Sequence, residues 1–416
     1  MFGSSMRTRR GWLAVLGAAV LVAMPAGWGQ TFSSTSTGAD GALDYTGTPA
    51  GTVIIFDPAT HQPALDVDGD NVYHFTTITI PANVTVKLTA PKLNYGPVYW
   101  LATGAVLIDG TLDLSGEDGH AEGVSATRTI SLPGPGGFPG GVGGSADSPA
   151  SQGFGPAGGT NGLGGGYGTP AAFSGATYGN VFLLPLIGGS GGAGSGTVGQ
   201  FGSGGGAGGG AILIASSASI RVNGTIRAVG GNGGDRSVLG PGGGGSGGAV
   251  RLLAPRILGT GSITTERGFA PGGYSNGGGQ GRIRLEAFRF DSVPALTGVS
   301  RVVTLSPQAI FLPTSNIPSV RVATVDGEAV PTDPTGSFLL PDVVINKPTQ
   351  LIMTIQAKNI PLGTTVQLRI LSQGGADQVW TTNPLAGTVA NSVADASGIL
   401  PPGFSRCFVH ATWTPQ

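Results

Sequence analysis

Charged side chains are scarce in this chain, and their scarcity excludes several classes of partner. Lys, Arg, Asp and Glu make up 10% of the 416 residues, against about 25% in ordinary soluble domains. The formal net charge is −1, and only four lysines are present. Such a chain offers no basic surface for nucleic acid or for an anionic membrane, so we expect neither as a partner.

Cysteine is almost absent, which excludes an internal disulfide framework. The single residue, Cys407, lies in Arg406–Ala411, an alternating run typical of a strand. We expect it to act as a small buried apolar residue, and a reactive thiol is the alternative. The sequence also lacks HExxH, CxxC, P-loop and GxSxG motifs in their structural contexts, which argues against most enzyme chemistry.

The N-terminus has the features of an export signal. Several arginines precede the apolar stretch Trp12–Met24, which matches a signal peptide in length and is short for a membrane span. Small residues place cleavage near Gly29–Gln30, so we expect a signal peptide over residues 1–29 and a secreted or cell-surface protein. An uncleaved anchor is the alternative, and Thr8–Leu13 also resembles a twin-arginine signal. No second apolar span follows, which predicts a mature chain without a transmembrane segment.

Glycine is abundant where charge is missing. The segment Ser131–Gly210 holds 32 glycines in 80 residues and one charged residue, Asp147. Besides the apolar run 181–187, which contains Phe182, six aromatic residues punctuate this segment and call for burial, namely Phe138, Phe154, Tyr167, Phe173, Tyr178 and Phe201. We therefore expect an ordered insertion over 131–210, packed as extended polyglycine helices, rather than a loose loop.

Two kinds of segment recur between the glycine tracts. The first kind includes 208–215 and 247–254, and the second places a glycine at one register, at Gly110, Gly224 and Gly261. Apolar residues flank these glycines with period two, which predicts strands whose buried residues are Val106, Ile108, Leu112, Ile220, Val222, Ile226, Ile257 and Ile263. Stacked repeats of this kind predict a parallel β-solenoid over 30–290, with Thr76–Leu88 as its first coil and cap.

The composition changes after Asp291. Short strand-like runs then alternate with turn signals, beginning with Val302–Leu305 and ending with Cys407–Trp413. This spacing predicts an immunoglobulin- or fibronectin-like β-sandwich over residues 295–416, so the whole chain is expected to be all-β.

Two acidic segments are candidate sites. Asp66, Asp68 and Asp70 resemble the start of a Ca²⁺ loop, although Asn71 stands where glycine is wanted, and a polar turn is the simpler interpretation. The other segment is a polar cluster comprising Glu117, Asp118, His120 and Glu122. It could bind Ca²⁺ or hold an acid/base pair, and a solvated loop explains it more simply. We expect no cofactor, with Ca²⁺ as the alternative.

A third set concerns polysaccharide lyases, which use parallel β-helices with carboxylates and a basic residue on one face. The comparable outward residues are Asp109, Asp113, Arg221 and Arg227. If the repeats stack with their shared glycines aligned, Asp113 lies beside Arg227 on neighbouring strands. A surface ion pair between them is the favoured interpretation.

The combination resembles Gly-rich secreted bacterial β-helix proteins of the adhesin and surface kind. The matching runs are Gly209–Ala215, Ile220–Ile226 and Pro402–Val409, and the resemblance spans most of residues 38–416. It implies an architecture and carries over no active-site residue.

These observations favour a secreted or cell-surface structural or adhesive protein without catalytic activity, for which an extracellular glycan or surface matrix is the expected partner. A carbohydrate-active β-helix, either lyase or glycan binder, is the alternative. A weaker alternative is ice binding, because outward Thr111 and Thr225 suggest a flat row of threonines. Asp113 and Arg227 interrupt that row.

Overall fold

The computed structural model describes residues 31–61, 63–65, 69–121, 128–172, 176–235, 240–298, 300–313, 318–332, 334 and 341–413. The expected signal peptide over 1–29 lies outside these ranges. Residues Phe32–Gln416 form one compact unit. Within the described ranges, no helix has both the length and the apolar character that crossing a bilayer requires.

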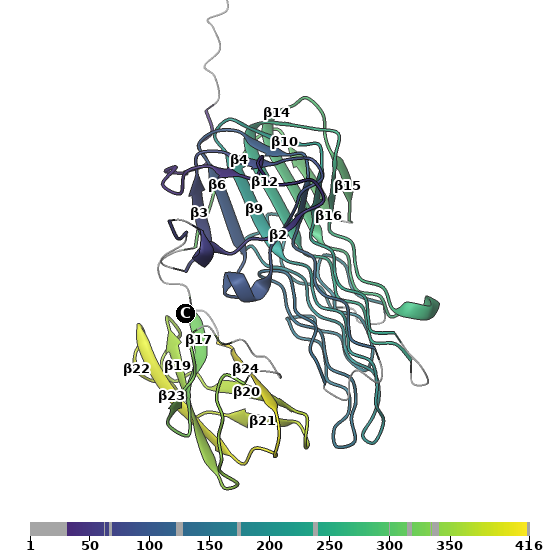
Figure 1. The fold of residues 1–416 in the computed structure, drawn as a ribbon, viewed down its shortest axis with the longest axis vertical. Coiled ribbons are helices and arrows are strands. Elements are labelled where there is room, and N and C mark those ends of the chain that lie inside the picture. Colours follow the sequence, from purple (N-terminus) through teal and green to yellow (C-terminus); the bar gives the residue numbers. More distant parts are fainter. Residues whose placement is uncertain are drawn as a thin grey trace, which may run out of the picture. The chain divides into compact units, whose positions relative to one another are not determined.

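Three ladders of parallel strands build the chain between residues 43 and 304 (Figure 1). The first ladder contains β3 (Val72–Phe75), β6 (Val98–Ala102), β9 (Ala211–Ser216), β12 (Ala249–Leu258), β14 (Arg282–Phe290) and β16 (Ser300–Thr304). The second contains β1 (Leu43–Asp44), β4 (Ile78–Ile80), β7 (Val106–Ile108), β10 (Ser219–Val222) and the end of β12. The third contains β2 (Val53–Ile55), β5 (Thr85–Lys87), β8 (Thr111–Asp113), β11 (Thr225–Arg227), β13 (Ser262–Thr264) and β15 (Ala295–Thr297).

Each passage of the chain through the three ladders, called a coil below, stacks on the previous one. Parallel all-β stacking of this kind fits a β-solenoid. The core prediction is confirmed, because all eight of the expected inward residues, from Val106 to Ile263, are fully buried. Each such side chain contributes about 1.5–3 kcal/mol by leaving water. Aromatic rings fill the N-terminal end of the core, where Phe56 lies edge-on to Tyr73 and Trp100.

Glycine at the shared register is required by close approach between coils. A Cβ on Gly224 would lie 1.8 Å from the carbonyl oxygen of Gly110, and a Cβ on Gly261 would lie 2.0 Å from that of Gly224. The corners of successive coils therefore stack backbone on backbone, which no other residue type permits.

Each coil contributes to three ladders, because two short strands meet at the shared glycine, as β7 and β8 do at Gly110. Two expectations about the repeats were wrong. Thr76–Leu88 is not the first coil, because β1 pairs with β4 and β2 pairs with β5, so that an earlier coil precedes it in the stack. The strand expected at Val302–Leu305 in the sandwich is replaced by β16, which pairs in parallel with β14. Parallel pairing thus continues past Asp291, since burial of Leu296 against the core extends the stack after glycine becomes sparse.

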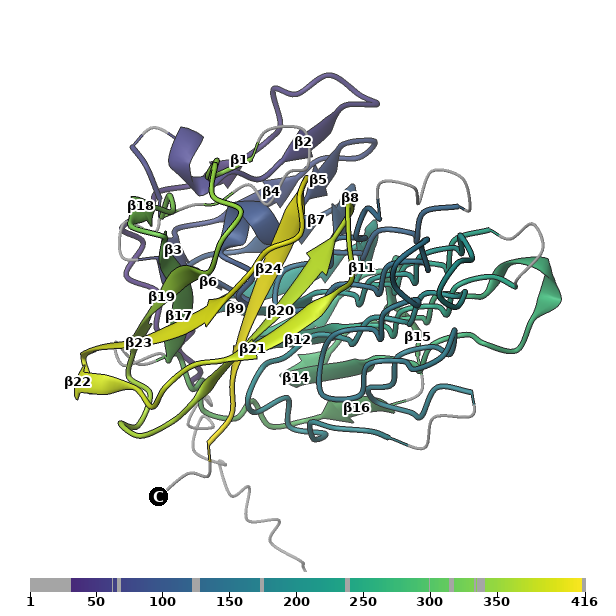
Figure 2. The same cartoon turned by 90° about the horizontal axis from the view of Figure 1, so that it is seen from below.

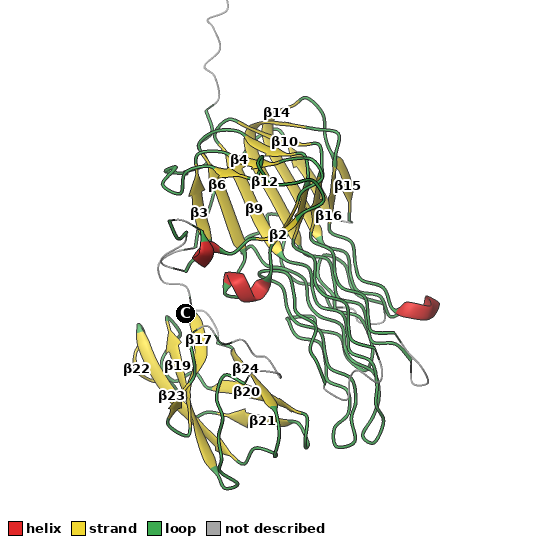
Figure 3. Cartoon of the chain, viewed as in Figure 1, coloured by secondary structure: helices red, strands yellow, loops and turns green. Residues whose placement is uncertain are grey.

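The long connections between coils form a second layer, the glycine bundle, defined as segments 114–120, 131–144, 151–159, 163–169, 188–195, 202–210, 228–234, 242–248, 265–269 and 276–281. In Figure 2 these connections run side by side beside the ladders, and Figure 3 draws them as loop rather than strand. Backbone N–H groups of one segment donate to carbonyl groups of others throughout the layer. The expected packing of extended glycine segments is confirmed.

Segment 202–210 shows the geometry of the bundle most clearly. The N–H groups of Gly204, Ala207 and Gly210 donate to His120, Glu117 and Leu114. Those of Gly205 and Gly208 donate to Gly141 and Phe138, and those of Gly206 and Gly209 donate to Gly243 and Ser246. Donors three residues apart therefore reach the same neighbouring segment, which is the three-residue turn of a polyproline II helix.

Burial of the punctuating aromatics is uneven. Tyr167 is fully buried, and its ring lies 4.8 Å from that of Tyr178. Phe138 and Phe154 are half-buried, whereas Phe201 is 45% exposed, so the expectation was wrong for Phe201. Phe201 follows a tight turn at the end of the bundle, closed by the hydrogen bond from the N–H of Gln200 to the carbonyl oxygen of Thr197. Phe173 lies outside the described residues.

The C-terminal strands are antiparallel. One sheet has the order β18 (Glu328–Ala329), β17 (Ser319–Val325), β19 (Leu351–Lys358), β23 (Asn391–Gly398) and β22 (Ala386–Thr388). The other has β21 (Gln378–Thr381), β20 (Val366–Ser372) and β24 (Ser405–Ala411). A common apolar core joins the two sheets, with Ile355 from β19 and Leu368 from β20 both fully buried. Three short 3₁₀ helices complete the described elements: η1 (Pro58–Thr60), η2 (Ala90–Leu93) and η4 (Pro271–Gly273).

Candidate functional site

The Ca²⁺ candidate is only partly described. Asp66 and Asp68 lie outside the described residues, and Asp70 accepts a hydrogen bond of 2.8 Å from the backbone N–H of Val72. Within the described ranges, no three His, Cys, Asp or Glu side chains gather as a metal site. Asp70 therefore caps the start of β3, which is what a polar turn does.

The carboxylates of the polar cluster accept hydrogen bonds from backbone N–H groups of neighbouring segments. Glu117 Oε2 accepts a hydrogen bond of 2.9 Å from the N–H of Leu132. Asp118 Oδ1 accepts one of 2.7 Å from the N–H of Asn232, in the next coil. His120 supplies its carbonyl oxygen to Gly204, and Glu122 lies outside the described residues. Among the described residues of the cluster, Glu117, Asp118 and His120 each bond a different segment of the glycine bundle rather than converging on one site.

The lyase set is divided into two pairs. Arg221 Nη2 donates to Asp109 Oδ2 at 2.6 Å, and Asn223 supports the same carboxylate at 2.9 Å. Asp113 and Arg227 are partners in the third ladder, as expected, but in the described part of the chain they form no ion pair. Lys87 stands on the other side of Asp113 in that ladder.

Two rows of side chains run across the outer face of the third ladder. One row aligns Thr85, Thr111, Thr225 and Ser262, and the Thr225 and Ser262 hydroxyls lie 3.2 Å apart. The other row aligns Lys87, Asp113, Arg227 and Thr264. The hydroxyl row is thus longer than Thr111 and Thr225 alone, and a charged row lies directly beside it.

A depression of about 300 Å³ lies at the edge of this face, where the third ladder enters the glycine bundle. We call it the Phe269 groove, and its functional side chains are Asp118, Arg227, Asn232, Glu266, Arg267 and Phe269. A smaller depression of about 160 Å³ adjoins it through Ser115 and is lined by Lys87 and Glu117.

Hydrogen bonds between successive coils fix the wall of the groove. Asn232 donates to Asp118 from its backbone N–H, and Asn232 Oδ1 accepts from the N–H of Phe269 at 2.9 Å. Asp118, Asn232 and Phe269 therefore form one row across three coils. The sequence analysis missed Arg267 and Phe269, because the repeat alignment stopped at the strands. Continuing it by five residues from Asp113, Arg227 and Thr264 would have aligned this row.

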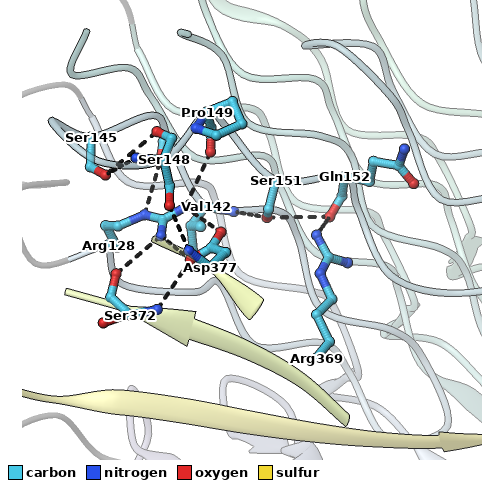
Figure 4. A network of polar contacts seen from close by, with 11 residues as sticks. Arg128, Val142, Ser145, Ser148, Pro149, Ser151, Gln152, Arg369, Ser372 and Asp377 are labelled. Carbon is cyan, nitrogen blue, oxygen red and sulfur yellow. Dashed lines mark hydrogen bonds and ion pairs between the residues drawn. The ribbon is translucent and has the colours of Figure 1, made fainter. Parts of the chain in front are cut away.

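A second polar constellation, the Arg128 network, joins the glycine bundle to the C-terminal strands (Figure 4). The Arg128 side chain is 1% exposed and forms a two-pronged ion pair with Asp377, in which Nη2 lies 2.9 Å from Oδ2. Arg128 also donates to the carbonyl oxygens of Gly143, Pro149 and Ser372. Every partner is structural, so this arrangement is a clamp rather than a reactive site.

A third constellation is buried on the outer side of the first ladder. Glu286 Oε1 accepts from Arg251 Nε at 2.8 Å and from Arg284 Nε at 2.7 Å. Glu286 Oε2 accepts from the N–H of Gln308, and Arg284 Nη1 reaches the carbonyl of Val181. The triad holds two covering segments against the sheet. In the apolar run 181–187, Leu183 and Leu186 are buried in an apolar cluster with residues of the first ladder, whereas Val181 and Phe182 remain about half exposed.

Cys407 is half-buried in β24 and packs against the C-terminal core. Burial raises the pKa of its thiol from 9.0 to about 12. Because the thiolate is the nucleophile, we expect the native protein to react with a disulfide reagent at pH 8 at least about a hundredfold more slowly than the unfolded chain.

Absorbance at the reagent's release wavelength measures this rate, and no other cysteine contributes to it. A folded-state pKa above the ordinary value also means that the associated stability is present below pH 9.0 and is lost as the pH rises towards about 12. Equal native and unfolded rates would restore the reactive-thiol alternative.

Comparison of the chain with protein-family models, with curated proteins and with solved structures found no match.

Proposed function

We propose that the protein is a secreted or cell-surface structural or adhesive protein without catalytic activity, of the Gly-rich β-helix kind, with an immunoglobulin- or fibronectin-like β-sandwich at its C-terminus. The observation that carries this proposal is the use of the polar groups. Glu117, Asp118 and Asp377 all accept hydrogen bonds from backbone or guanidinium donors that hold the fold together. Carboxylates committed in this way make poor general acids or bases, whereas a rigid scaffold with a long exposed face suits a matrix or adhesive role.

A carbohydrate-active β-helix is the second candidate, and the Phe269 groove favours it. A depression with several convergent polar groups and an aromatic side chain is what a ligand site requires. Ice binding has less support, because Lys87, Asp113 and Arg227 lie beside the hydroxyl row and break up a uniform surface.

The lyase assay separates the proposal from its nearest rival. The purified mature chain is incubated with polygalacturonate and with alginate, with and without Ca²⁺, and ultraviolet absorbance is followed for unsaturated products. We expect no increase above a heat-denatured control, and we expect cell fractionation to recover the protein outside the cytoplasm. A Ca²⁺-dependent increase in absorbance, or recovery only from the cytoplasm, would contradict the proposal.

A further inference from the structure

The geometry of the Phe269 groove points to a binding site for a neutral oligosaccharide chain. This inference rests on the proposed function, because it names the partner that an adhesive surface protein would hold. Three features of the groove carry it: an aromatic platform, a balanced set of charges, and a continuation along the stack of coils.

The platform is Phe269. Phe269 is 56% exposed, so its ring is available to a ligand at the surface of the groove. The Arg267 guanidinium lies 5.4 Å from the ring centroid, which holds the ring in place by a cation–π contact. The apolar face of a sugar ring packs against such an aromatic surface, while its hydroxyl groups stay in contact with polar neighbours.

The charges around the platform are balanced. Arg227 and Arg267 supply guanidinium donors, and Glu266 supplies a carboxylate acceptor. Asp118 adds a second negative charge, although both of its oxygens already accept hydrogen bonds from Asn232. In the described part of the chain, neither arginine has an ion-pair partner, and Arg267 Nε is buried without a hydrogen-bond partner. Equal numbers of cations and anions give no preference for a polyanion. A ligand rich in hydroxyl groups can use both kinds of group, because each hydroxyl donates and accepts.

The site continues beyond one coil. The smaller depression shares Ser115 with the groove and adds Lys87 and Glu117, again of opposite sign. Successive parallel strands are about 4.8 Å apart, so a chain that crosses the coils meets a new set of polar groups at each step. An extended oligosaccharide fits this repetition better than a compact ligand does.

Affinity electrophoresis through gels that contain hydroxyethylcellulose, xyloglucan, galactomannan or laminarin tests the site. We expect at least one of these neutral polysaccharides to retard the mature protein, equally at low and high salt. Phe269→Ala and Arg267→Ala should weaken the retardation about tenfold or more, as truncation of a binding hot spot does.

Two matched controls remove the same side chains elsewhere. Phe201→Ala removes a similarly exposed ring at the end of the glycine bundle, and Arg221→Ala removes an outward arginine that is paired with Asp109. Both should bind as the unchanged protein does, and thermal melting confirms that all four variants are folded.

Retardation by none of the four gels, or full retardation of Phe269→Ala, would overturn the inference. Retardation only by polygalacturonate, abolished by salt, would also overturn it and indicate a polyanion site. A protein that is recovered outside the cytoplasm, cleaves no polysaccharide and binds none of these probes would leave the proposed function standing without this site. Lyase activity together with loss of binding in Phe269→Ala would keep the site and remove the proposed function.

Discussion

Replacing Gly205 with alanine should destroy the cooperative fold of the glycine bundle, while the same change at Gly204 should be tolerated. A Cβ on Gly205 would lie 2.0 Å from the carbonyl oxygen of Gly192 and 2.4 Å from its carbonyl carbon. Backbone atoms cannot move aside as a side chain can, so we expect a loss of about 3 kcal/mol or more. Gly206 is equally constrained, because its Cβ would lie 2.0 Å from the Gly231 oxygen.

Gly204 is the matched control for this prediction. Its nearest backbone atoms would lie 3.3 Å from a new Cβ, and its φ is outside the left-handed region. Alanine also loses less backbone entropy on folding than glycine, so the net change should stay within about 1 kcal/mol. Thermal melting and limited proteolysis across residues 131–210 measure both variants. Equal melting temperatures for Gly204→Ala and Gly205→Ala, or rapid native cleavage throughout this segment, would show that the bundle is not packed.

Replacing Arg128 with methionine should cost about 3 kcal/mol of stability, because it leaves the partners of a buried guanidinium unsatisfied. The guanidinium serves Asp377 and three carbonyl oxygens at once. Asp377 also accepts from the N–H of Ser372, and losing the arginine leaves this partly buried carboxylate without its ion-pair partner. A lysine ammonium cannot make the two parallel hydrogen bonds of the planar guanidinium, so Arg128→Lys should retain only part of the stability that Arg128→Met loses.

The apolar contacts around the Arg128 network should keep the two parts associated and allow the effect to be measured. Ile130, Val142 and Leu371 are buried together, and the Phe154 and Phe408 rings lie 4.5 Å apart. Lys347→Ala is the control, because the Lys347–Asp326 pair is exposed and should contribute under about 1 kcal/mol. If thermal melting shows the same shift for Arg128→Met as for Lys347→Ala, the clamp has no special role.

The sequence predicted the core of the ladders well because period-two patterning records burial directly. Ile220, Val222 and Ile226 alternate with polar residues, and their burial follows from that alternation. The glycine bundle was predicted as an ordered layer of extended polyglycine helices, but the neighbour that each residue contacts was not predicted. A glycine that contacts one neighbouring segment looks the same in the sequence as a glycine that contacts another.

The polar sites were harder to predict, because their partners are far apart in the sequence and because the sequence does not show which group a side chain bonds. Arg128 and Asp377 are 249 residues apart, and nothing in either local sequence indicates the other. The carboxylates of Glu117 and Asp118 were recognisable as a cluster, but composition alone cannot show that they accept backbone hydrogen bonds from Leu132 and Asn232. Phe269 stood out neither in composition nor in the strand repeat.

The rotation of donors along segment 202–210 restricts how the bundle can change in length. Its N–H groups point to three neighbouring segments in turn, so removing one or two residues would direct every later donor towards the wrong neighbour. Removing three residues directs every later donor back to its original neighbouring segment. A strand that slips by two residues keeps its faces, and a bundle segment that slips by three keeps its partners. Within the bundle, insertions and deletions compatible with this fold are therefore multiples of three residues. Changes of any length are compatible in its end turns, such as 196–201, which lie outside the three-residue pattern of donors.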